Sequence, residues 1–503
     1  MNNTTHINRI VISGVKSGSG KTTLTCGLIR AFLNRGLKTA SRKCGPDYID
    51  PMFHRRVLGI ETGNLDPFFT DDETLKYLMT KDCEDCDIEI IEGVMGFYDG
   101  LGGITTGAST YDVARITDSP VILVVDAKGV SVTLSAVIQG IINYRKDNNI
   151  KGVILNRMSA GFYERIAGLI EKECNIRVLG FLPELKEAEL RSRHLGLVQP
   201  DELEDLDEVL NRLASQIEET IDVDGIYKIA EGANDIIYNA TIHGRKEALA
   251  APKESDCSRT DDNCLTECRD GVCSPGMPAA LEKLLTSDRV QSIRRAAPII
   301  AIAKDRAFGF YYDDNIRLLK ELGARIEYFS PLKDKKLPAG TQGIILYGGY
   351  PEEHCHELSS NTSMLEAIRE AYRMGIPIIA ECGGFMYLMD TLEDREGNGY
   401  RMCGVIPGRA YCTGHTVRFG YMHAEALNGG LYGDKGIDFN GHEFHHWDCT
   451  INGEDFIAHK PLSDRTYKCM IHEETLAAGF PHIYAYGNPE MYVNFLLNTI
   501  TAS

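Results

Sequence analysis

The chain has 503 residues, of which 43% are hydrophobic and 25% charged, a composition typical of a globular protein with about two to four domains. Its formal net charge is -19, and the absence of clustered Lys and Arg argues against a nucleic-acid partner. The sequence contains neither a run of about 18 apolar residues nor a signal-peptide pattern, so we expect no membrane partner and a cytoplasmic location.

The first half of the chain alternates short apolar runs with amphipathic segments. Runs at 7–14, 87–93, 119–127 and 150–158 indicate strands buried on both faces, and 21–36 indicates a helix that follows the first of them. Buried strands separated by helices predict an α/β fold with a doubly wound parallel sheet. We assign residues 1–235 to this domain.

A glycine-rich loop, VISGVKSGSGKTTLT, connects the first predicted strand to the first predicted helix. In such a loop the backbone amides bind phosphate oxygens, the Lys reaches the terminal phosphates and the following Thr hydroxyl faces Mg²⁺. Five residues separate Gly14 from Gly20, one more than in the common phosphate loop. The predicted ATP-binding residues are Gly14, Lys16, Gly18, Gly20, Lys21, Thr22, Thr23 and, after a later strand, Asn156.

Two acidic clusters lie near the ends of predicted strands. RKCGPDYIDP contains Asp47 and Asp50, and IIEGVMGFYDG contains Glu92 and Asp99. Ligands of open parallel sheets bind outside the carboxyl ends of the strands, and nucleotide-bound Mg²⁺ takes one or two carboxylates. A purely local role stays open for Asp47, because Asp in a GPD turn also bonds its own backbone. We predict Thr22, Asp47 and Glu92 as metal ligands and Tyr48, Asp50 and Asp99 as substrate-binding residues.

Residues 236–297 form a polar segment that is poor in large apolar residues and predicts a linker. Its four cysteines are not spaced like paired zinc ligands, so a metal or redox role and an incidental thiol-rich linker both stay open. These cysteines are Cys257, Cys264, Cys268 and Cys273. The other cysteines are scattered over the chain, which predicts reduced thiols rather than a disulfide framework.

The alternation of short apolar runs and amphipathic segments resumes in the last part of the chain, residues 298–503. Apolar runs at 297–305, 324–331, 343–349, 375–384 and 402–408 predict the strands of a second α/β domain. One of these strands leads directly into the stretch AECGGFMYL.

In this stretch a cysteine, Cys382, lies between a predicted strand and a glycine pair that opens a predicted helix. Strand, sharp turn and helix together present a nucleophile in a cleft, and we expect the helix N-terminus to lower the pKa of the thiol. The alternative is a small buried hydrophobic residue, as we expect for Cys26, Cys174 and Cys403. An oxyanion formed on the substrate needs backbone amides, and we predict those of Gly349 and Gly383.

Eight motifs, in this order, resemble the cobyrinic acid a,c-diamide synthase family: GPDYIDPMFH, GNLDPFF, EGVMGFYDG, SRHLGL, FSPL, GGYPEEH, AECGGFMYLM and GHEFHH. The resemblance covers both domains and fails only in the Cys-rich linker. It implies an N-terminal domain similar to dethiobiotin synthetase and a C-terminal class I-type glutamine amidotransferase domain. The family amidates the a and c carboxylates of cobyrinic acid in anaerobic cobalamin synthesis, with one ATP and one glutamine per amide and an acyl phosphate intermediate.

The resemblance also implies site residues and partners. Cys382 would attack glutamine, and His445, the last residue of GHEFH, would be the general base. Glu443 shares the His445 face of an extended segment and is a candidate to orient its ring, although the acid of such triads usually follows its His. The implied small-molecule partners are cobyrinic acid, glutamine, ATP and Mg²⁺, and a homodimer stays open.

Several other functions are compatible with parts of the sequence. Hydrogenobyrinic acid or nickel sirohydrochlorin could be the ring that is amidated, whereas GGYPEEH and GPDYIDP disfavour a cobyric acid synthase. A P-loop partitioning ATPase would suit Lys16 and GKTT, but it has no use for Cys382 and His445. A lyase or chaperone-like member of the amidotransferase fold would need no ATP.

Overall fold

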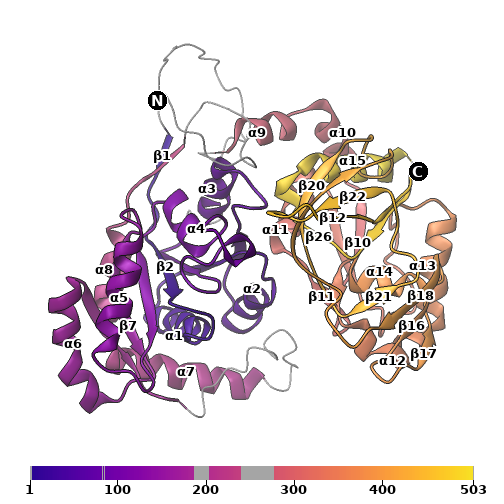
Figure 1. Ribbon diagram of the computed structural model, residues 1–503. Coiled ribbons are helices and arrows are strands. Elements are labelled where there is room, and N and C mark those ends of the chain that lie inside the picture. Colours follow the sequence, from indigo (N-terminus) through magenta and orange to yellow (C-terminus); the bar gives the residue numbers. More distant parts are fainter. Residues whose placement is uncertain (1–2, 82, 84, 186–202, 239–276, 502–503) are drawn as a thin grey trace.

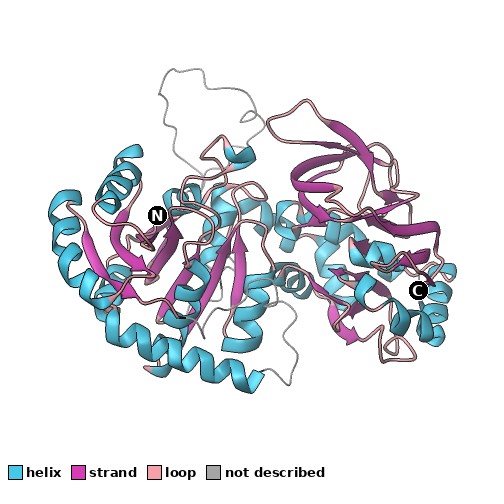
Figure 2. Ribbon diagram, turned by 60° about the horizontal axis from the view of Figure 1, so that its bottom comes forward, coloured by secondary structure: helices cyan, strands magenta, loops and turns pink. Residues whose placement is uncertain are grey.

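The computed structural model describes residues 3–81, 83, 85–185, 203–238 and 277–501 (Figure 1). It contains two α/β units, which lie side by side in Figure 1. Figure 2 shows that helices flank the strands of both units. The SRHLGL motif and the four linker cysteines lie outside the described residues. Among the described helices, none is both long and apolar enough to cross a membrane.

The N-terminal unit is built on a seven-stranded sheet in which all neighbouring strands are parallel. The strand order is β4–β3–β5–β2–β6–β7–β8, which confirms the predicted doubly wound sheet. The strands are β2 (Arg9–Gly14), β3 (Thr39–Cys44), β4 (Thr62–Leu65), β5 (Ile88–Glu92), β6 (Val121–Asp126), β7 (Ile150–Asn156) and β8 (Arg177–Leu182).

Helices cover both faces of this sheet because its strands are apolar on both sides. One face packs against α1 (Lys21–Asn34), α7 (Leu203–Thr220) and α8 (Val223–Glu231). The other face packs against α3 (Asp72–Thr80), α4 (Thr110–Ile116), α5 (Thr133–Tyr144) and α6 (Ala160–Cys174). The short helix α2 (Ile49–Phe53) continues into a π-helical turn, His54–Leu58, and a 3₁₀ turn forms at Leu101–Gly103.

The C-terminal unit has a six-stranded sheet of order β12–β10–β13–β15–β25–β24, parallel except for β24. Its strands are β10 (Ile299–Ala303), β12 (Arg325–Phe329), β13 (Gly343–Leu346), β15 (Ile378–Glu381), β24 (Ile471–His472) and β25 (Leu476–Gly479). Its helices are α11 (Asp313–Leu322), α12 (Cys355–Ser360), α13 (Thr362–Arg373), α14 (Gly383–Tyr387) and α15 (Pro489–Thr501). With the N-terminal sheet, it confirms the predicted α/β fold class.

Three smaller sheets of the C-terminal unit were not predicted. A five-stranded antiparallel sheet joins β23 (Thr466–Cys469), β22 (Phe456–His459), β19 (Arg418–Ala426), β20 (Asp438–His445) and β26 (His482–Ile483). A four-stranded sheet joins β17 (Gly399–Arg401), β16 (Met389–Glu393), β18 (Ile406–Cys412) and β21 (Trp447–Cys449). The short strands β11 (Phe308–Phe310) and β14 (Gly348–Gly349) pair with each other. Two 3₁₀ turns, Pro351–Glu353 and Ala485–Gly487, complete this unit.

The remaining elements border or belong to the segment that separates the two units. β1 (Asn3–Thr5) pairs with β9 (Ile236–Tyr238), and two helices follow, α9 (Ala279–Leu285) and α10 (Asp288–Ala296). Arg289 of α10 forms an ion pair with Glu490 and a hydrogen bond to Asn494, both in α15. The described end of this polar segment is therefore attached to the C-terminal unit.

Candidate active sites

The phosphate loop leaves β2 at Gly14 and enters α1 at Lys21. Gly20, the residue before α1, has φ 95°, a conformation that favours glycine, and a Cβ there would lie 2.1 Å from the Asn156 amide nitrogen. That amide donates a hydrogen bond of 2.9 Å to the Ser19 carbonyl. Asn156, at the end of β7, therefore holds the loop in place. Lys16 is 3.4 Å from Asp126 at the end of β6.

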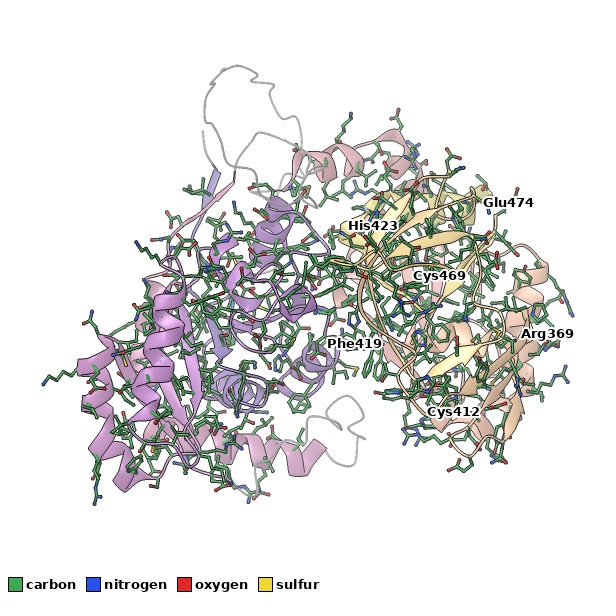
Figure 3. The ribbon with its side chains drawn as sticks, viewed as in Figure 1. Arg369, Cys412, Phe419, His423, Cys469 and Glu474 are labelled. Carbon is green, nitrogen blue, oxygen red and sulfur yellow. The ribbon has the colours of Figure 1, made fainter. Side chains whose placement is uncertain are left out.

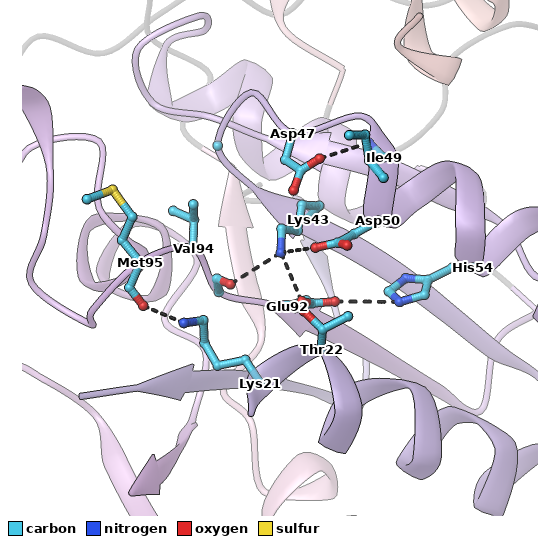
Figure 4. Close-up of polar contacts among 12 residues, drawn as sticks. Lys21, Thr22, Lys43, Asp47, Ile49, Asp50, His54, Glu92, Val94 and Met95 are labelled. Carbon is cyan, nitrogen blue, oxygen red and sulfur yellow. Dashed lines mark hydrogen bonds and ion pairs between the residues drawn. The ribbon is translucent and has the colours of Figure 1, made fainter. Parts of the chain in front are cut away.

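Lys43 joins the two acidic clusters into one buried network (Figure 4). Its ammonium lies 2.5 Å from Asp50 Oδ2 and 2.9 Å from Glu92 Oε1. The Thr22 hydroxyl donates to the same Glu92 oxygen over 2.6 Å. Because β2, β3 and β5 run parallel, their carboxyl ends deliver these residues to one edge of the sheet. The sequence prediction that these side chains lie near the phosphate loop is thereby met in the structure.

The charges of this network are strongly coupled. Burial would lower the pKa of Lys43, but Asp50 and Glu92 hold it well above its usual value. Burial and the nearby Asp50 raise the pKa of Glu92 to about 7. Burial and Lys43 lower the pKa of Lys21 to about 8, and its ammonium donates to the Lys16 and Met95 carbonyls. The network therefore contains cations and carboxylates whose protonation responds to a bound phosphate or cation.

Asp47 and Asp99 also make local contacts. Asp47 accepts a 2.8 Å hydrogen bond from the Ile49 amide, the local role that the sequence left open, and burial and Asp50 raise its pKa to about 6. Asp99 accepts a 2.8 Å bond from the Gly96 amide and shapes the loop after β5. These bonds use only one oxygen of each carboxylate.

The donor set fits a nucleotide-bound Mg²⁺ rather than a metal held by protein alone. Within the described residues no group of three or more His, Cys, Asp or Glu side chains is arranged to hold a metal ion. Glu92 Oε2 is buried with no hydrogen-bond partner in the part of the chain that the structure describes, and it lies 3.5 Å from His54 Nε2. Burial lowers the His54 pKa to about 4. Glu92 Oε2, which lies beside a neutral imidazole, is a hard oxygen ligand of the kind that Mg²⁺ prefers. The Thr22 hydroxyl is a second such ligand.

Cys382 lies at a strained turn between β15 and α14. Its φ of 48° and ψ of -106° are unusual for a residue with a side chain, and its amide donates to the Gly479 carbonyl over 2.8 Å. A Cβ on Gly384 would lie 2.0 Å from the Leu346 carbonyl oxygen, so only glycine fits where the helix crosses β13. This is the sharp strand–turn–helix geometry predicted from the sequence.

The expected lowering of the Cys382 pKa is wrong. Burial raises the pKa of this thiol to about 12, and the Glu352 carboxylate adds to the rise, whereas the Gly383 amide opposes it only weakly. A buried thiolate beside acidic groups is costly, and one helix terminus does not offset that cost. Deprotonation of Cys382 therefore needs a base or a bound substrate.

The two predicted oxyanion donors lie together. A Cβ on Gly383 would be 2.9 Å from the Gly349 amide nitrogen, and one on Gly349 would be 2.0 Å from the Ala307 carbonyl oxygen. Gly349 pairs with Phe308 of β11, which fixes this turn against the strand. The geometry leaves no room for side chains beside the nucleophile.

His445 lies at the end of β20, stacked on Phe480 with ring centroids 3.8 Å apart. Its Nδ1 is 2.6 Å from the Trp447 carbonyl oxygen, whereas Nε2 is buried without a partner among the described residues. Glu443, the candidate to orient the ring, makes no hydrogen bond or ion pair with it among the described residues. Glu443 shares the face but is engaged by the Tyr467 hydroxyl and, at 3.5 Å, by Lys460.

Comparisons with known proteins agree with this two-site arrangement. A model of the CobQ/CobB/MinD/ParA nucleotide binding domain matches residues 10–198, and one of the CobB/CobQ-like glutamine amidotransferase domain matches residues 299–484. Cobyrinate a,c-diamide synthase of Caldanaerobacter subterraneus subsp. tengcongensis is 37% identical over 97% of this chain and 97% of the relative. The synthase of Fusobacterium nucleatum is 38% identical over 95% of this chain and 97% of the relative. That of Thermoplasma acidophilum is 34% identical over 97% of this chain and 99% of the relative.

The chain belongs to the cobyrinate a,c-diamide synthase family. The chain combines the two domains that the sequence predicted, one nucleotide-binding and one of the glutamine amidotransferase type. The cysteines expected to be packing residues, Cys26, Cys174 and Cys403, are buried, which confirms that part of the sequence analysis.

One histidine beside the Cys382 turn, His482, was not predicted from the sequence. It lies three residues after Gly479, whose carbonyl binds the Cys382 amide, and its Nδ1 is 3.8 Å from Glu381 Oε2. A Cβ on Gly348 would be 2.5 Å from its Cε1, so the ring packs on the turn that carries the oxyanion donors. Burial lowers its pKa to about 3. No local motif marks His482, because the pairings of β25 with β15 and of β26 with β20 bring it here.

Tyr48 extends from the acidic loop of the N-terminal unit into the C-terminal unit. Its ring lies 5.1 Å from that of His482 and stacks on Phe310 at 5.3 Å. The loop is also anchored across the junction, because the Tyr312 hydroxyl donates to the Pro46 carbonyl over 3.1 Å. Burial raises the pKa of Tyr48 well above its usual value, and Cys382 contributes to the rise. The acidic loop therefore borders both sites.

Proposed function

We propose that this chain converts the a and c carboxylates of cobyrinic acid to primary amides, with ATP and with ammonia taken from glutamine, in the anaerobic route to cobalamin. The observation that carries the proposal is the contact between the two sites. The loop of Asp47 and Asp50 belongs to the phosphate site, and its Tyr48 packs on His482 beside the Cys382 turn. A protein that only hydrolysed ATP would gain nothing from this junction.

In the N-terminal unit, a carboxylate oxygen of the substrate attacks the γ-phosphorus of ATP, and ADP leaves. The acyl phosphate formed has a better leaving group than a carboxylate oxygen. Ammonia then attacks the acyl carbon, and phosphate leaves and takes up the proton that the nitrogen loses. Lys21 and the loop amides of Gly14, Gly18 and Gly20 bind the phosphates, with Lys16, Thr23 and Asn156 supporting the nucleotide.

Thr22, Asp47 and Glu92 would hold Mg²⁺, which neutralises charge on the transferring phosphoryl group. Tyr48, Asp50 and Asp99 would position the substrate. The pairing of Asp50 with Lys43 supports this assignment, because the ion pair keeps a carboxylate charged at the edge of the loop.

In the C-terminal unit, the Cys382 thiolate attacks the side-chain amide carbon of glutamine, and ammonia leaves after it receives a proton. Water then hydrolyses the thioester to glutamate. The amides of Gly349 and Gly383 would stabilise the oxyanion. We assign the general base to His445, whose Nε2 is buried and has no partner among the described residues.

His482 is a second candidate for the base, and one observation favours it. A catalytic histidine is commonly oriented by a carboxylate, and His482 lies beside Glu381, whereas His445 faces a backbone carbonyl. The variants His445→Gln and His482→Gln separate the two assignments. The variant that replaces the true base should hydrolyse glutamine about 10²-fold more slowly or worse. Both variants should keep amidation with added ammonia.

We assign ATP-dependent amidation and glutamine hydrolysis to separate domains. We propose residues 1–235 as the synthetase domain, 236–297 as the connecting segment and 298–503 as the amidotransferase domain. Whether the working form is a homodimer is answered by the mass of the purified protein in solution.

The decisive experiment supplies purified protein with ATP, Mg²⁺, glutamine and one tetrapyrrole acid at a time, and counts added amides by mass spectrometry. We expect two amides on cobyrinic acid. The same gain on hydrogenobyrinic acid or nickel sirohydrochlorin alone would assign the reaction to that ring instead. ATP hydrolysis without any amide formation would contradict the proposal.

A further inference from the structure

Five large apolar side chains are exposed in segments that lie at the junction of the two units or beside the phosphate site. Met95 is 48% exposed and Ile104 80% in the N-terminal unit. Phe419 is 66% exposed, Phe444 48% and Leu462 53% in the C-terminal unit. We call these residues the apolar rim. Single exposed apolar residues are normal, but several gathered at one junction indicate a surface that is covered during function.

Phe419 and Phe444 form the part of the rim on β19 and β20. They are direct partners across the two strands, with ring centroids 5.3 Å apart at 84°. Figure 3 shows Phe419 on the side of the C-terminal unit that faces the N-terminal unit. Tyr421, two residues further on the same face, donates a 2.8 Å hydrogen bond to Asp66. This face of the β19–β20 pair therefore contacts the N-terminal unit at one end and leaves two aromatic rings exposed to solvent at the other.

Leu462 and Ile104 bring the two units together at the rim. A Cβ on Gly102 would lie 3.5 Å from Leu462 Cδ1 and 3.7 Å from Ile104 Cγ1. Both side chains therefore lie beside Gly102, although they come from different units. At this point the rim includes residues of both units rather than of one loop.

Backbone strain is present at two residues of the rim. Met95 has φ 49° and Leu462 φ 57°, a conformation that is rare for bulky side chains. A solvated loop has no reason to adopt it only to present an apolar side chain to water, and such strain concentrates at binding sites. Met95 also adjoins the phosphate site, because its carbonyl accepts a 2.5 Å hydrogen bond from Lys21.

We propose that the apolar rim binds the conjugated ring face of the tetrapyrrole substrate, with its peripheral carboxylates directed to the loop of Asp47 and Asp50. The inference rests on the proposed function and locates its substrate. ATP and glutamine are polar and are served by buried polar groups, so the macrocycle is the one proposed substrate whose binding would remove a large apolar surface from water. Tyr421 links the rim to that loop, because its hydroxyl lies 3.6 Å from a Cβ built on Gly45.

The test is an absorbance titration of cobyrinic acid against Phe419→Ala, Phe444→Ala and Ile104→Ser. We expect the Kd for cobyrinic acid to rise at least about 10-fold for each variant, because each loses an apolar contact with the ring. The KM for glutamine, which reports that the C-terminal unit is folded, should stay within about twofold for these variants. The matched control is Met374→Ala, a residue that is 68% exposed at the end of α13 and outside the rim, for which we expect no change.

The outcomes separate this inference from the proposed function. Wild type that amidates cobyrinic acid, with unchanged Kd in all three variants, overturns the rim as the ring site. If wild-type protein binds cobyrinic acid but forms no amide, the proposed function is overturned. A raised Kd in the variants would then still support the apolar rim as the binding site of the ring. If sedimentation velocity shows that the variants lose a dimer and Kd is unchanged, the rim is an interface between two copies, and the inference is wrong.

Discussion

Replacing Gly349 by Ala tests the oxyanion donors with a perturbation that the structure quantifies. The added Cβ would lie 2.0 Å from the Ala307 carbonyl oxygen and 2.9 Å from Phe308 Cα, whereas real Cβ atoms stay at least 3.0 Å from other heavy atoms. Backbone faces backbone here, so the turn must shift by about 1 Å, enough to break a hydrogen bond to the oxyanion. Loss of one such donor costs about 10²–10³ in kcat, or about 3–4 kcal/mol.

The assay measures glutamate release from glutamine and, separately, amide formation with added ammonium salt. We expect Gly349→Ala to lower glutamine hydrolysis by about 10²-fold or more, with ammonia-driven synthesis retained as proof of folding. Gly399→Ala is the matched control, because a Cβ there meets no atom within 4 Å and its φ is not in the left-handed range. Glutamine hydrolysis within threefold of wild type in Gly349→Ala would refute the assignment of this amide.

Four further predictions follow from the two sites. Cys382→Ala should abolish glutamine-driven amide synthesis and keep the ammonia-driven reaction, as read from product mass; loss of both would show that the sites are not separable. Glu92→Gln should lower ATP-dependent amidation by about 10²-fold or more with glutaminase retained, and a normal amide yield would reject Glu92 as a ligand. Because the pKa of Cys382 is raised to about 12, iodoacetamide should label its peptide slowly at pH 7.5 without substrates; fast labelling would contradict the buried protonated thiol. Burial and Lys460 lower the pKa of His442 to about 4, so the folded state loses stability as pH falls from 6.5 toward 4. In urea unfolding, the free energy of unfolding of His442→Phe should fall less than that of wild type between pH 6.5 and 4. Equal falls would argue against a lowered pKa of His442.

The parts of the sites that could be predicted are contiguous in the sequence. The phosphate loop and the turn around Cys382 are each defined by neighbouring residues, because backbone geometry at Gly20 and Gly384 demands glycine. The acids at the ends of β3 and β5 could be predicted because parallel strands bring their carboxyl ends to one edge.

Other features depend on contacts between distant residues. Lys43 bridges Asp50 and Glu92 only after β3 and β5 pair, and His482 reaches the Cys382 turn through the pairings of β25 with β15 and of β26 with β20. The raised pKa of Cys382 reflects burial and Glu352, which comes from a different turn. The antiparallel strands β19 and β20 were missed because the apolar runs marked buried parallel strands, whereas these strands alternate buried and exposed residues.

The hydrogen bond from Tyr312 to Pro46 has a consequence for protein engineering. The loop that presents Asp47 is anchored partly by the amidotransferase half, so the synthetase half produced alone would lack one of its supports. Grafting an amidotransferase from a distant relative would require its counterparts of Tyr312, Phe310 and His482 to accept Tyr48. We therefore expect domain exchange within this family to succeed only when the junction residues are transferred together. In a design, the contacts between the two halves must be conserved as a unit.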